Sequence, residues 1–259
     1  MPKSLFEVDE CVASHVENLW ASGEGYNAAA DVLSAIGWYI PPAAAYLRYS
    51  RKLLKKWKIE EPPAQAAPLS PKIVLGLAGL AVAVGLIDVG ALLLSGFDAI
   101  LRSQDLFSLR VRDVQILENG AFLRLSSTKT SARHGGKEIV SIRSAAARRA
   151  LAAAIHRRPP SDLVLARPKH HLRSIFTALL AFFSLDANRL QLYSLRRGGA
   201  SWDFMQHGSI DTTLERGRWQ QARTAKIYVQ TAVAEAHDLA IPPKTRRELQ
   251  YFTRYIATL

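Results

Sequence analysis

The spacing of apolar positions predicts a chain that is mainly helical. In the stretch AAADVLSAIGWYI, the apolar residues Val32, Leu33, Ile36 and Tyr39 recur at helical intervals, and the chain up to about Ile59 has the character of short helices. The same spacing returns from Ser144 onward, in SAAARRALAAAIHRR, in SIFTALLAFFSL and in the segments that follow. Helices are therefore expected at both ends of the chain.

The middle of the chain has a different period. The stretch VQILENGAFLRLSSTK contains two strand-like runs around Asn119-Gly120, a dipeptide preferred in tight hairpins. A third strand-like run, KEIVSI, follows the polar segment SARHGG. We therefore expect a small three-stranded antiparallel sheet in an otherwise mainly α protein.

A Pro- and Ala-rich segment, EEPPAQAAPLSP, separates the first helices from the rest of the chain. It has almost no bulky apolar residue, which is typical of an extended linker. We therefore predict a helical N-terminal domain over residues 1–62, a linker over 63–71 and a second domain over 72–259.

The most apolar part of the chain, residues 73–97, has the length of a membrane span. Asp88 lies inside it, and a carboxylate in the middle of a bilayer costs several kcal/mol unless it is paired. We therefore predict two buried helices and no membrane partner; a membrane protein is the alternative.

The charge balance points to a polyanionic partner. The formal net charge is +12 and the isoelectric point about 10.0, and Lys and Arg gain affinity for phosphates by releasing counterions. The run RKLLKKWK places cations on one side of an amphipathic helix. This side is either a solvated helix face or a surface that follows phosphates. We predict DNA contacts by Lys52, Lys55 and Lys56.

Several site types are excluded. The single cysteine, Cys11, allows neither an internal disulfide nor a Cys-based zinc cluster, which favours a reducing, intracellular compartment. The start of the chain lacks the apolar stretch of a secretory signal. The sequence has no GxxxxGK[ST] phosphate loop and no HExxH, and His, Asp and Glu do not cluster at ligand spacing. We therefore expect no metal and no cofactor.

What remains is an ordered set of Arg, Lys and Tyr motifs. In AILRSQDLFSLRVRDV, Arg102 is followed three positions later by Asp105, and STKT carries Lys129 at the expected hairpin tip. The stretch YSLRRGGAS contains Tyr193 and Arg196. In GRWQQARTAKIY, Trp219 stands nine residues before Tyr228. In this order the motifs, over about residues 71–235, resemble the tyrosine recombinase (phage integrase-like) family. The N-terminal helices resemble its core-binding domain more loosely.

The resemblance implies DNA strand cleavage and rejoining, as in site-specific recombination or integration. Tyr228 would be the nucleophile and form a 3′-phosphotyrosine, which needs neither ATP nor metal for resealing. Arg102 and Arg196 would bind the phosphate, since guanidinium stays protonated and forks onto phosphate oxygens. Their charge should also favour the phenolate of Tyr228. Lys129 would protonate the leaving 5′ oxygen, and Trp219 would donate its indole N–H to the phosphate.

Alternatives stand beside these roles. Lys137 is the second choice for the general acid, and Tyr251 and Tyr255 are alternative nucleophiles. Arg197 and Arg223 are expected to be phosphate contacts or surface charges rather than catalysts.

The clearest departure from the family pattern is Tyr193, which stands where the family usually has histidine and which we include among the catalytic residues. A phenol accepts a proton only weakly at neutral pH. A neighbour such as His207, or water, would then take the proton of Tyr228; otherwise the enzyme is slow or inactive.

The expected partner is duplex DNA, on which copies of the chain would assemble as a homo-oligomer. The expected location is intracellular and DNA-associated, in the nucleus of a eukaryote or the cytoplasm and nucleoid of a prokaryote. The C-terminal segment ELQYFTRYIATL is amphipathic, and docking on a neighbouring subunit is a hypothesis for it. The rival functions are a catalytically impaired DNA-binding relic of a mobile element and a type IB topoisomerase.

Overall fold

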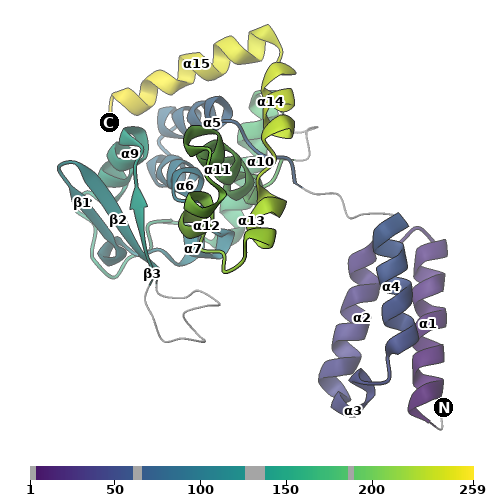
Figure 1. Cartoon of the computed structure of the whole chain (residues 1–259). Helices are drawn as coiled ribbons and strands as arrows, with labels where there is room; N and C mark the ends of the chain where they lie inside the picture. The colour runs from purple at the N-terminus through teal and green to yellow at the C-terminus, as the bar shows by residue number, and fades with distance from the viewer. Residues whose placement is uncertain (1–3, 61–65, 126–137, 186–189) are drawn as a thin grey trace. The chain divides into compact units, whose positions relative to one another are not determined.

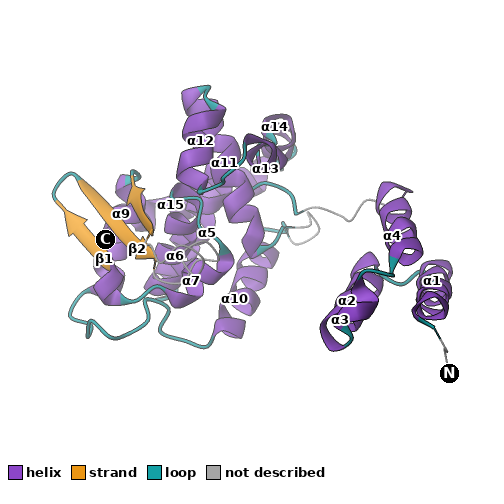
Figure 2. Cartoon of the chain, turned by 60° about the horizontal axis from the view of Figure 1, so that its bottom comes forward, coloured by secondary structure: helices purple, strands orange, loops and turns teal. Residues whose placement is uncertain are grey.

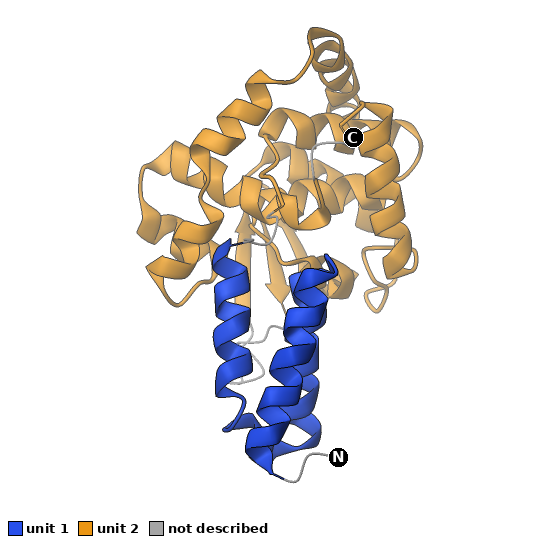
Figure 3. Cartoon of the chain, turned by 90° about the vertical axis from the view of Figure 1, so that its right-hand side faces the viewer, with its two compact units in different colours: residues 1–65 blue, residues 66–259 orange. Residues whose placement is uncertain are grey.

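The computed structural model describes residues 4–60, 66–125, 138–185 and 190–259 (Figure 1). The chain divides into two compact units, Met1–Gln65 and Ala66–Leu259, which are coloured separately in Figure 3. The described residues are mainly helical and include a three-stranded antiparallel sheet, so the predicted fold class is confirmed.

The first unit consists of α1 (Leu5–Ala21), α2 (Tyr26–Tyr39), α3 (Pro41–Ala44) and α4 (Arg48–Glu60). Trp57 of α4 is buried in the core of this unit. Its ring stacks on that of Trp20, with centroids 5.4 Å apart, and the ring of Tyr26 lies edge-on to it at 6.2 Å. The buried carboxylate of Asp9 in α1 accepts hydrogen bonds from the backbone N–H groups of Tyr49 (2.8 Å) and Ser50 (3.0 Å). These bonds tie the first turn of α4 to α1.

Helix α4 has two different sides. Ser50, Leu54 and Trp57, at intervals of four and three residues, are buried. Lys52, Lys55 and Lys56, which we predicted to contact DNA, are exposed. The amphipathic pattern of the sequence is therefore present as one apolar and one cationic side.

The second unit contains most of the chain. Its elements, in order, are α5 (Pro71–Ala83), α6 (Ile87–Asp98), α7 (Ser103–Ser108), the 3-10 turn η1 (Val111–Asp113), β1 (Val114–Leu117), β2 (Gly120–Leu125), β3 (Glu138–Ile142), α9 (Ala145–Ile155), α10 (Lys169–Phe182), α11 (Leu192–His207), α12 (Ile210–Gly217), α13 (Ala222–Tyr228), α14 (Thr231–Leu239) and α15 (Pro243–Ala257). The sheet lies at one side of the unit beside α9 (Figure 2).

The apolar stretch 73–97 forms two separate buried helices, α5 and α6. Asp88 in the first turn of α6 accepts two hydrogen bonds from Arg167, at 3.1 and 3.2 Å, and one from the backbone N–H of Ala166 at 3.0 Å. Its charge is therefore paired inside the protein. Within the described ranges, no helix is both long and apolar enough to cross a membrane.

The sheet has the strand order β1-β2-β3. Leu117 pairs with Gly120, so Glu118 and Asn119 form the loop between the first two strands. The predicted hairpin turn at Asn119-Gly120 is therefore displaced by one residue, because Gly120 already belongs to β2. Side chains of β2 alternate, with Ala121, Leu123 and Leu125 buried in the core.

The C-terminal helix α15 packs along α5 of the same chain (Figure 1). Two glycines of α5 allow the close approach. A Cβ atom on Gly76 would lie 2.3 Å from the side chain of Leu249, and one on Gly79 would lie 2.1 Å from the carbonyl oxygen of Phe252. Leu249 and Ile256 are buried by this contact. The apolar face for which we suggested a neighbouring subunit is thus covered within the chain.

Part of the predicted linker, 63–71, belongs to the second unit. Residues 66–70 are buried, and Leu69 donates its backbone N–H to the carbonyl oxygen of Ser194 at 3.2 Å. Gly198 makes room for this strand-like segment, because a Cβ atom there would lie 2.1 Å from the carbonyl oxygen of Leu69. The segment therefore has few bulky side chains because it packs closely against α11, and not only because it is extended.

Candidate active site

Tyr228 is the last residue of α13, and its backbone is held against α11. Arg197 of α11 donates from Nη2 to the carbonyl oxygen of Ile227 at 2.9 Å. Ser201, one turn further along α11, donates to the carbonyl oxygen of Tyr228 at 3.3 Å and accepts from the backbone N–H of Gln230 at 2.9 Å. The short helix that carries Tyr228 is thus fixed at its end.

The phenol of Tyr228 lies among three of the predicted site residues. Its hydroxyl accepts a short hydrogen bond from the hydroxyl of Tyr193. Its ring centroid is 4.6 Å from that of Trp219, and the guanidinium carbon of Arg196 lies 5.3 Å from the Tyr228 ring and 4.5 Å from the Trp219 ring. The structure therefore brings Tyr193, Arg196, Trp219 and Tyr228 together. They come from α11, α13 and the loop between α12 and α13, and these helices lie side by side in Figure 2.

Trp219 packs under this helix. It is buried in a small apolar cluster with Ile100, Ala200 and Ala225. Its ring lies over Gly217, where a Cβ atom would be 1.8 Å from the indole, so only glycine fits there. Trp219 thus packs against α13, as a core aromatic residue would, and it also contacts Arg196.

Arg196 is almost fully buried. Its Nη1 donates to the carbonyl oxygen of Ile100 and its Nη2 to that of Gly217 at 2.7 Å. Ile100 has φ +51°, a left-handed conformation that is unusual for a β-branched residue and that turns its carbonyl toward the site. Each Nη group thus donates one hydrogen bond to the main chain, and Nε has no partner among the described residues. The predicted fork onto a phosphate stays a prediction.

Arg102 lies at the start of α7, next to the acid of its motif. Its backbone N–H donates to Oδ2 of Asp105 at 2.9 Å, which caps the helix. Its Nη2 donates to the carbonyl oxygen of Arg218 at 3.4 Å. The Arg102 side chain therefore points to the turn that precedes Trp219.

Arg218 is a third arginine at this point, and the sequence reasoning missed it. Its side chain is 9% exposed, and Nη2 donates to Oδ2 of Asp105 at 3.0 Å and to the carbonyl oxygen of Ile100 at 3.3 Å. Nε lies 3.7 Å from Oε2 of Glu138 in β3. The only signal in the sequence was its position directly before Trp219.

The three arginines carry more positive charge than their surroundings balance. Burial and the nearby charges of Arg102 and Arg218 lower the pKa of Arg196 to about 10, which still leaves it protonated at neutral pH. Within the described part of the chain, Nη1 of Arg102, Nε of Arg196 and Nη1 of Arg218 are buried without a hydrogen-bond partner. Since buried polar groups are normally paired, these nitrogens suit an anionic ligand.

Tyr193 differs from a histidine in its proton chemistry. Burial, the hydrogen bond to Tyr228 and the nearby Tyr228 charge raise the pKa of Tyr193 well above its usual value, against the opposing effect of Arg196 and Arg197. The Tyr193 phenol therefore stays protonated. It can donate a hydrogen bond to the Tyr228 oxygen but cannot act as a base at neutral pH.

The predicted general acid and the two predicted phosphate contacts of this unit complete the set. Lys129 and its alternative Lys137 fall outside the described residues. Arg223 is exposed on α13, as a surface contact would be. Arg197 is buried and bound to the backbone before Tyr228, so an exposed phosphate contact does not match its position.

The alternative catalytic residues are distant from Tyr228 or contact other partners. His207 lies 14 residues after Tyr193 on α11, about 21 Å along the helix, and contacts Arg143 and Asp203. Tyr251 and Tyr255 are on α15, where their rings lie 6.2 Å apart. No group of His, Cys, Asp and Glu side chains among the described residues could hold a metal ion.

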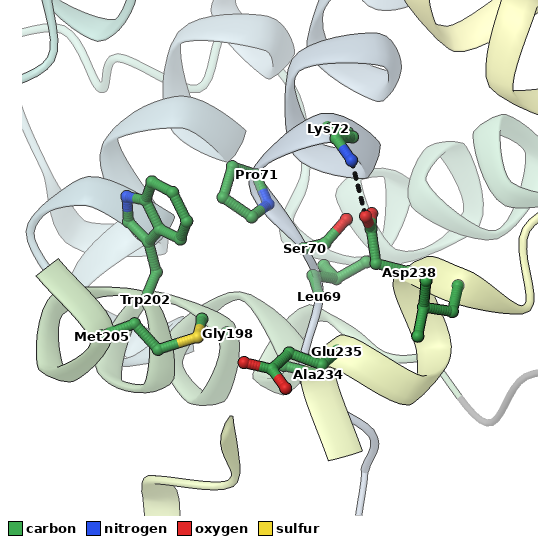
Figure 4. A pocket seen from close by; sticks show the side chains of 11 residues that line it. Leu69, Ser70, Pro71, Lys72, Gly198, Trp202, Met205, Ala234, Glu235 and Asp238 are labelled. Carbon is green, nitrogen blue, oxygen red and sulfur yellow. Dashed lines mark hydrogen bonds and ion pairs between the residues drawn. The ribbon is translucent and has the colours of Figure 1, made fainter. Parts of the chain in front are cut away.

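A separate groove of about 480 Å³ lies on the opposite face of α11 (Figure 4). Gly198, Trp202 and Met205, spaced four and three residues apart, line it from α11, while Tyr193 and Arg196 are on the other side of that helix. The pair Lys72–Asp238, 2.7 Å apart, lies at its edge. The groove is therefore not part of the site around Tyr228.

Comparisons with known proteins bear on the fold. No protein-family model and no curated protein matches the sequence. Among solved structures, XerA recombinase is similar with a TM-score of 0.53 and 17% identity over 74% of this chain and 73% of that one. XerH bound to its difH substrate before cleavage gives 0.52 and 12%, over 80% and 67%. A lambda integrase dimer bound to a COC' core site gives 0.59 and 12%, over 86% and 65%. The chain therefore has the fold of the tyrosine recombinases, as the order of its motifs had suggested.

Proposed function

We propose that this chain cleaves one strand of duplex DNA with Tyr228 and rejoins it to another 5′-hydroxyl. The proposal rests on one observation: two phenols lie beside a buried group of arginines whose positive charge is only partly balanced. Tyr193 and Tyr228 share a hydrogen bond, Arg196 lies against the Tyr228 ring, and donors of Arg102 and Arg196 lack partners. A phosphodiester would supply the missing negative charge.

In the cleavage step, the Tyr228 oxygen forms a bond to phosphorus while the bond from phosphorus to the 5′ oxygen breaks. The product is a 3′-phosphotyrosine and a 5′-hydroxyl. The phenol proton passes to solvent, because Tyr193 stays protonated. Lys129, by the family resemblance, gives its proton to the leaving oxygen. Attack by a second 5′-hydroxyl reverses the step and seals the strand.

The arginines act on the transition state. Attack adds negative charge to the nonbridging oxygens, and fixed guanidinium groups in a water-poor site stabilise that charge without having to reorganise. Tyr193 contributes the hydrogen bond that it already donates to the Tyr228 oxygen, which favours the attacking phenolate. In this way a phenol can stand at the histidine position without serving as a base.

Strand exchange needs two DNA sites, so we propose that copies of the chain assemble on DNA. XerH was solved bound to difH, and lambda integrase was solved as a dimer on its core site. The excess of cations and the exposed lysines of α4 support binding to duplex DNA, wherever in the cell that DNA lies.

The test is capture of a covalent adduct. The protein is incubated with a pool of nicked duplexes of randomised sequence, and DNA that stays attached in SDS is sequenced. We expect adducts with the parent protein and none with Tyr228→Phe. Adducts that persist in Tyr228→Phe, or that form only through Tyr251 or Tyr255, would contradict the proposal.

A second candidate is a catalytically impaired DNA-binding protein. Two observations favour it: Tyr193 cannot accept a proton, and both Nη groups of Arg196 are bound to main-chain carbonyls. Retention of duplex DNA on a filter, without any adduct at excess protein, would select this function. Relaxation of supercoiled plasmid without site preference would instead indicate topoisomerase activity.

A further inference from the structure

We propose that Arg218 is a positioning residue that connects the two phosphate-binding arginines and adds a third positive charge to the site. The inference rests on the proposed function, but it concerns a residue that the family motifs do not include. Its basis is a set of shared hydrogen-bond acceptors.

Arg218 shares one acceptor with each of the other two arginines. Oδ2 of Asp105 accepts from Arg218 Nη2 and from the backbone N–H of Arg102. The carbonyl oxygen of Ile100 accepts from Arg218 Nη2 and from Arg196 Nη1. The carbonyl oxygen of Arg218 itself accepts from Arg102 Nη2 at 3.4 Å. A movement of Arg218 would therefore change the position of both neighbours.

The backbone at Arg218 would suit glycine better than arginine. Arg218 follows the last residue of α12 with φ +57° and ψ +47°, the left-handed region that L residues rarely occupy. The side chain nevertheless fills the centre of the site and reaches α7 and β3. A helix cap alone gives no reason for an arginine here, whereas a role for its side chain does.

The charge of Arg218 is only partly balanced. Burial lowers its pKa, and so does the like charge of Arg102, although Asp105 and Glu138 oppose this. In the part of the chain that the structure describes, Nη1 of Arg218 is buried without a partner, as is Nη1 of Arg102. An anion between these arginines would relieve their repulsion, and Arg218 would then raise the affinity for the charge that develops during cleavage.

The matched variants are Arg218→Gly and Arg157→Gly. Arg157 has nearly the same backbone conformation, φ +56°, but is exposed. Glycine is tolerated at both positions, so the two substitutions change the unfolded chain and the backbone alike. Arg218→Lys keeps the charge but loses the planar guanidinium, whose Nη2 reaches Asp105 and Ile100 while its Nε lies 3.7 Å from Glu138.

The readout is the single-turnover rate constant of adduct formation at saturating protein. A merely structural role would lower the amplitude, which follows the folded fraction, and leave the rate constant unchanged. We expect a drop of at least tenfold in Arg218→Gly, at least threefold in Arg218→Lys, and less than twofold in Arg157→Gly. A rate constant at the parent level in Arg218→Lys, or in folded Arg218→Gly, would overturn the proposal.

A second measurement separates this inference from the proposed function. If the parent forms no adduct, the thermal midpoint is compared in inorganic phosphate and in chloride of equal ionic strength. We expect phosphate to stabilise the parent and Arg157→Gly equally, and the Arg218 variants by less than half as much. If phosphate does not stabilise the parent, or stabilises all variants alike, Arg218 does not organise an anion site.

Discussion

Two groups of buried charges lie close together in the second unit, and they differ in how completely they are paired. The first surrounds Asp203 of α11, which accepts from Thr213 at 2.8 Å and from Arg216, with His207 and Arg143 within 4.0 Å. Among the described residues, no buried side-chain nitrogen or oxygen of this group lacks a hydrogen-bond partner.

The second group consists of Arg102, Arg196 and Arg218 around the buried carboxylate of Asp105, with Oε2 of Glu138 3.7 Å from Nε of Arg218. Several of its guanidinium nitrogens, all within the described residues, have no partner. Removing one partner from a paired buried group destabilises the fold, and a buried charge that has no partner reduces stability unless a ligand completes it. Surplus positive charge, and not burial alone, sets the second group apart, and it is the reason why we propose an anion-binding site there.

Asp203→Asn tests the paired group and should have the largest effect on stability. The substitution leaves the largely buried guanidinium of Arg216 without its counter-charge. This should lower the free energy of unfolding by roughly 3 kcal/mol and the thermal midpoint by about 10 °C. Thermal unfolding followed by circular dichroism measures the shift. The rate constant of adduct formation by the folded fraction should stay within a few-fold of the parent. An unchanged midpoint would remove the contrast between the two groups.

Arg102→Ala tests the unpaired group. Its guanidinium makes one long side-chain hydrogen bond, so the midpoint should change little. The rate of adduct formation should fall by about 10²–10³, the loss typical of removing one donor to a transition-state charge. Single-turnover kinetics with Arg157→Ala as the exposed control gives the ratio. A fall in stability without a fall in rate would make Arg102 a structural residue.

Tyr193→Phe should have a smaller effect. It removes the hydroxyl that donates to Tyr228 but keeps the ring. Loss of one such hydrogen bond corresponds to about a tenfold slower cleavage. DNA affinity, measured by fluorescence anisotropy, should not change. A rate equal to that of the parent would show that the hydroxyl of Tyr193 has no part in cleavage.

The exposed lysines of the first unit should have the smallest individual effects. If Lys52, Lys55 and Lys56 neutralise phosphates, each alanine substitution should reduce the slope of log affinity against log salt by about one. Titrations at several salt concentrations measure this slope for the single and triple variants. Cleavage at saturating DNA should be unaffected. A slope that stays constant in the triple variant would make this side of α4 a solvated surface.

Much of the fold followed from local patterns. Helical spacing predicted the helices at both ends, and two strand-like runs around Asn119-Gly120 predicted the hairpin, because each pattern depends on neighbouring residues alone. Asp88 correctly marked the apolar stretch as two buried helices, since a charge there needs a partner such as Arg167. The hairpin turn was predicted one residue late. The sequence alone does not show where a strand ends and its turn begins, because that depends on which residues pair across the hairpin.

The sequence by itself determined the order of the motifs, the nine-residue interval from Trp219 to Tyr228 and the excess of positive charge. Only the tertiary structure decided that Arg218 joins Arg102 and Arg196, that Arg197 turns inward to hold the chain before Tyr228, and that α15 covers α5 of its own chain. These contacts join residues 30 to more than 170 positions apart in the sequence. Which of the many arginines meet in one site depends on how the helices pack against one another. A local sequence pattern carries no information on contacts between residues so far apart in the chain.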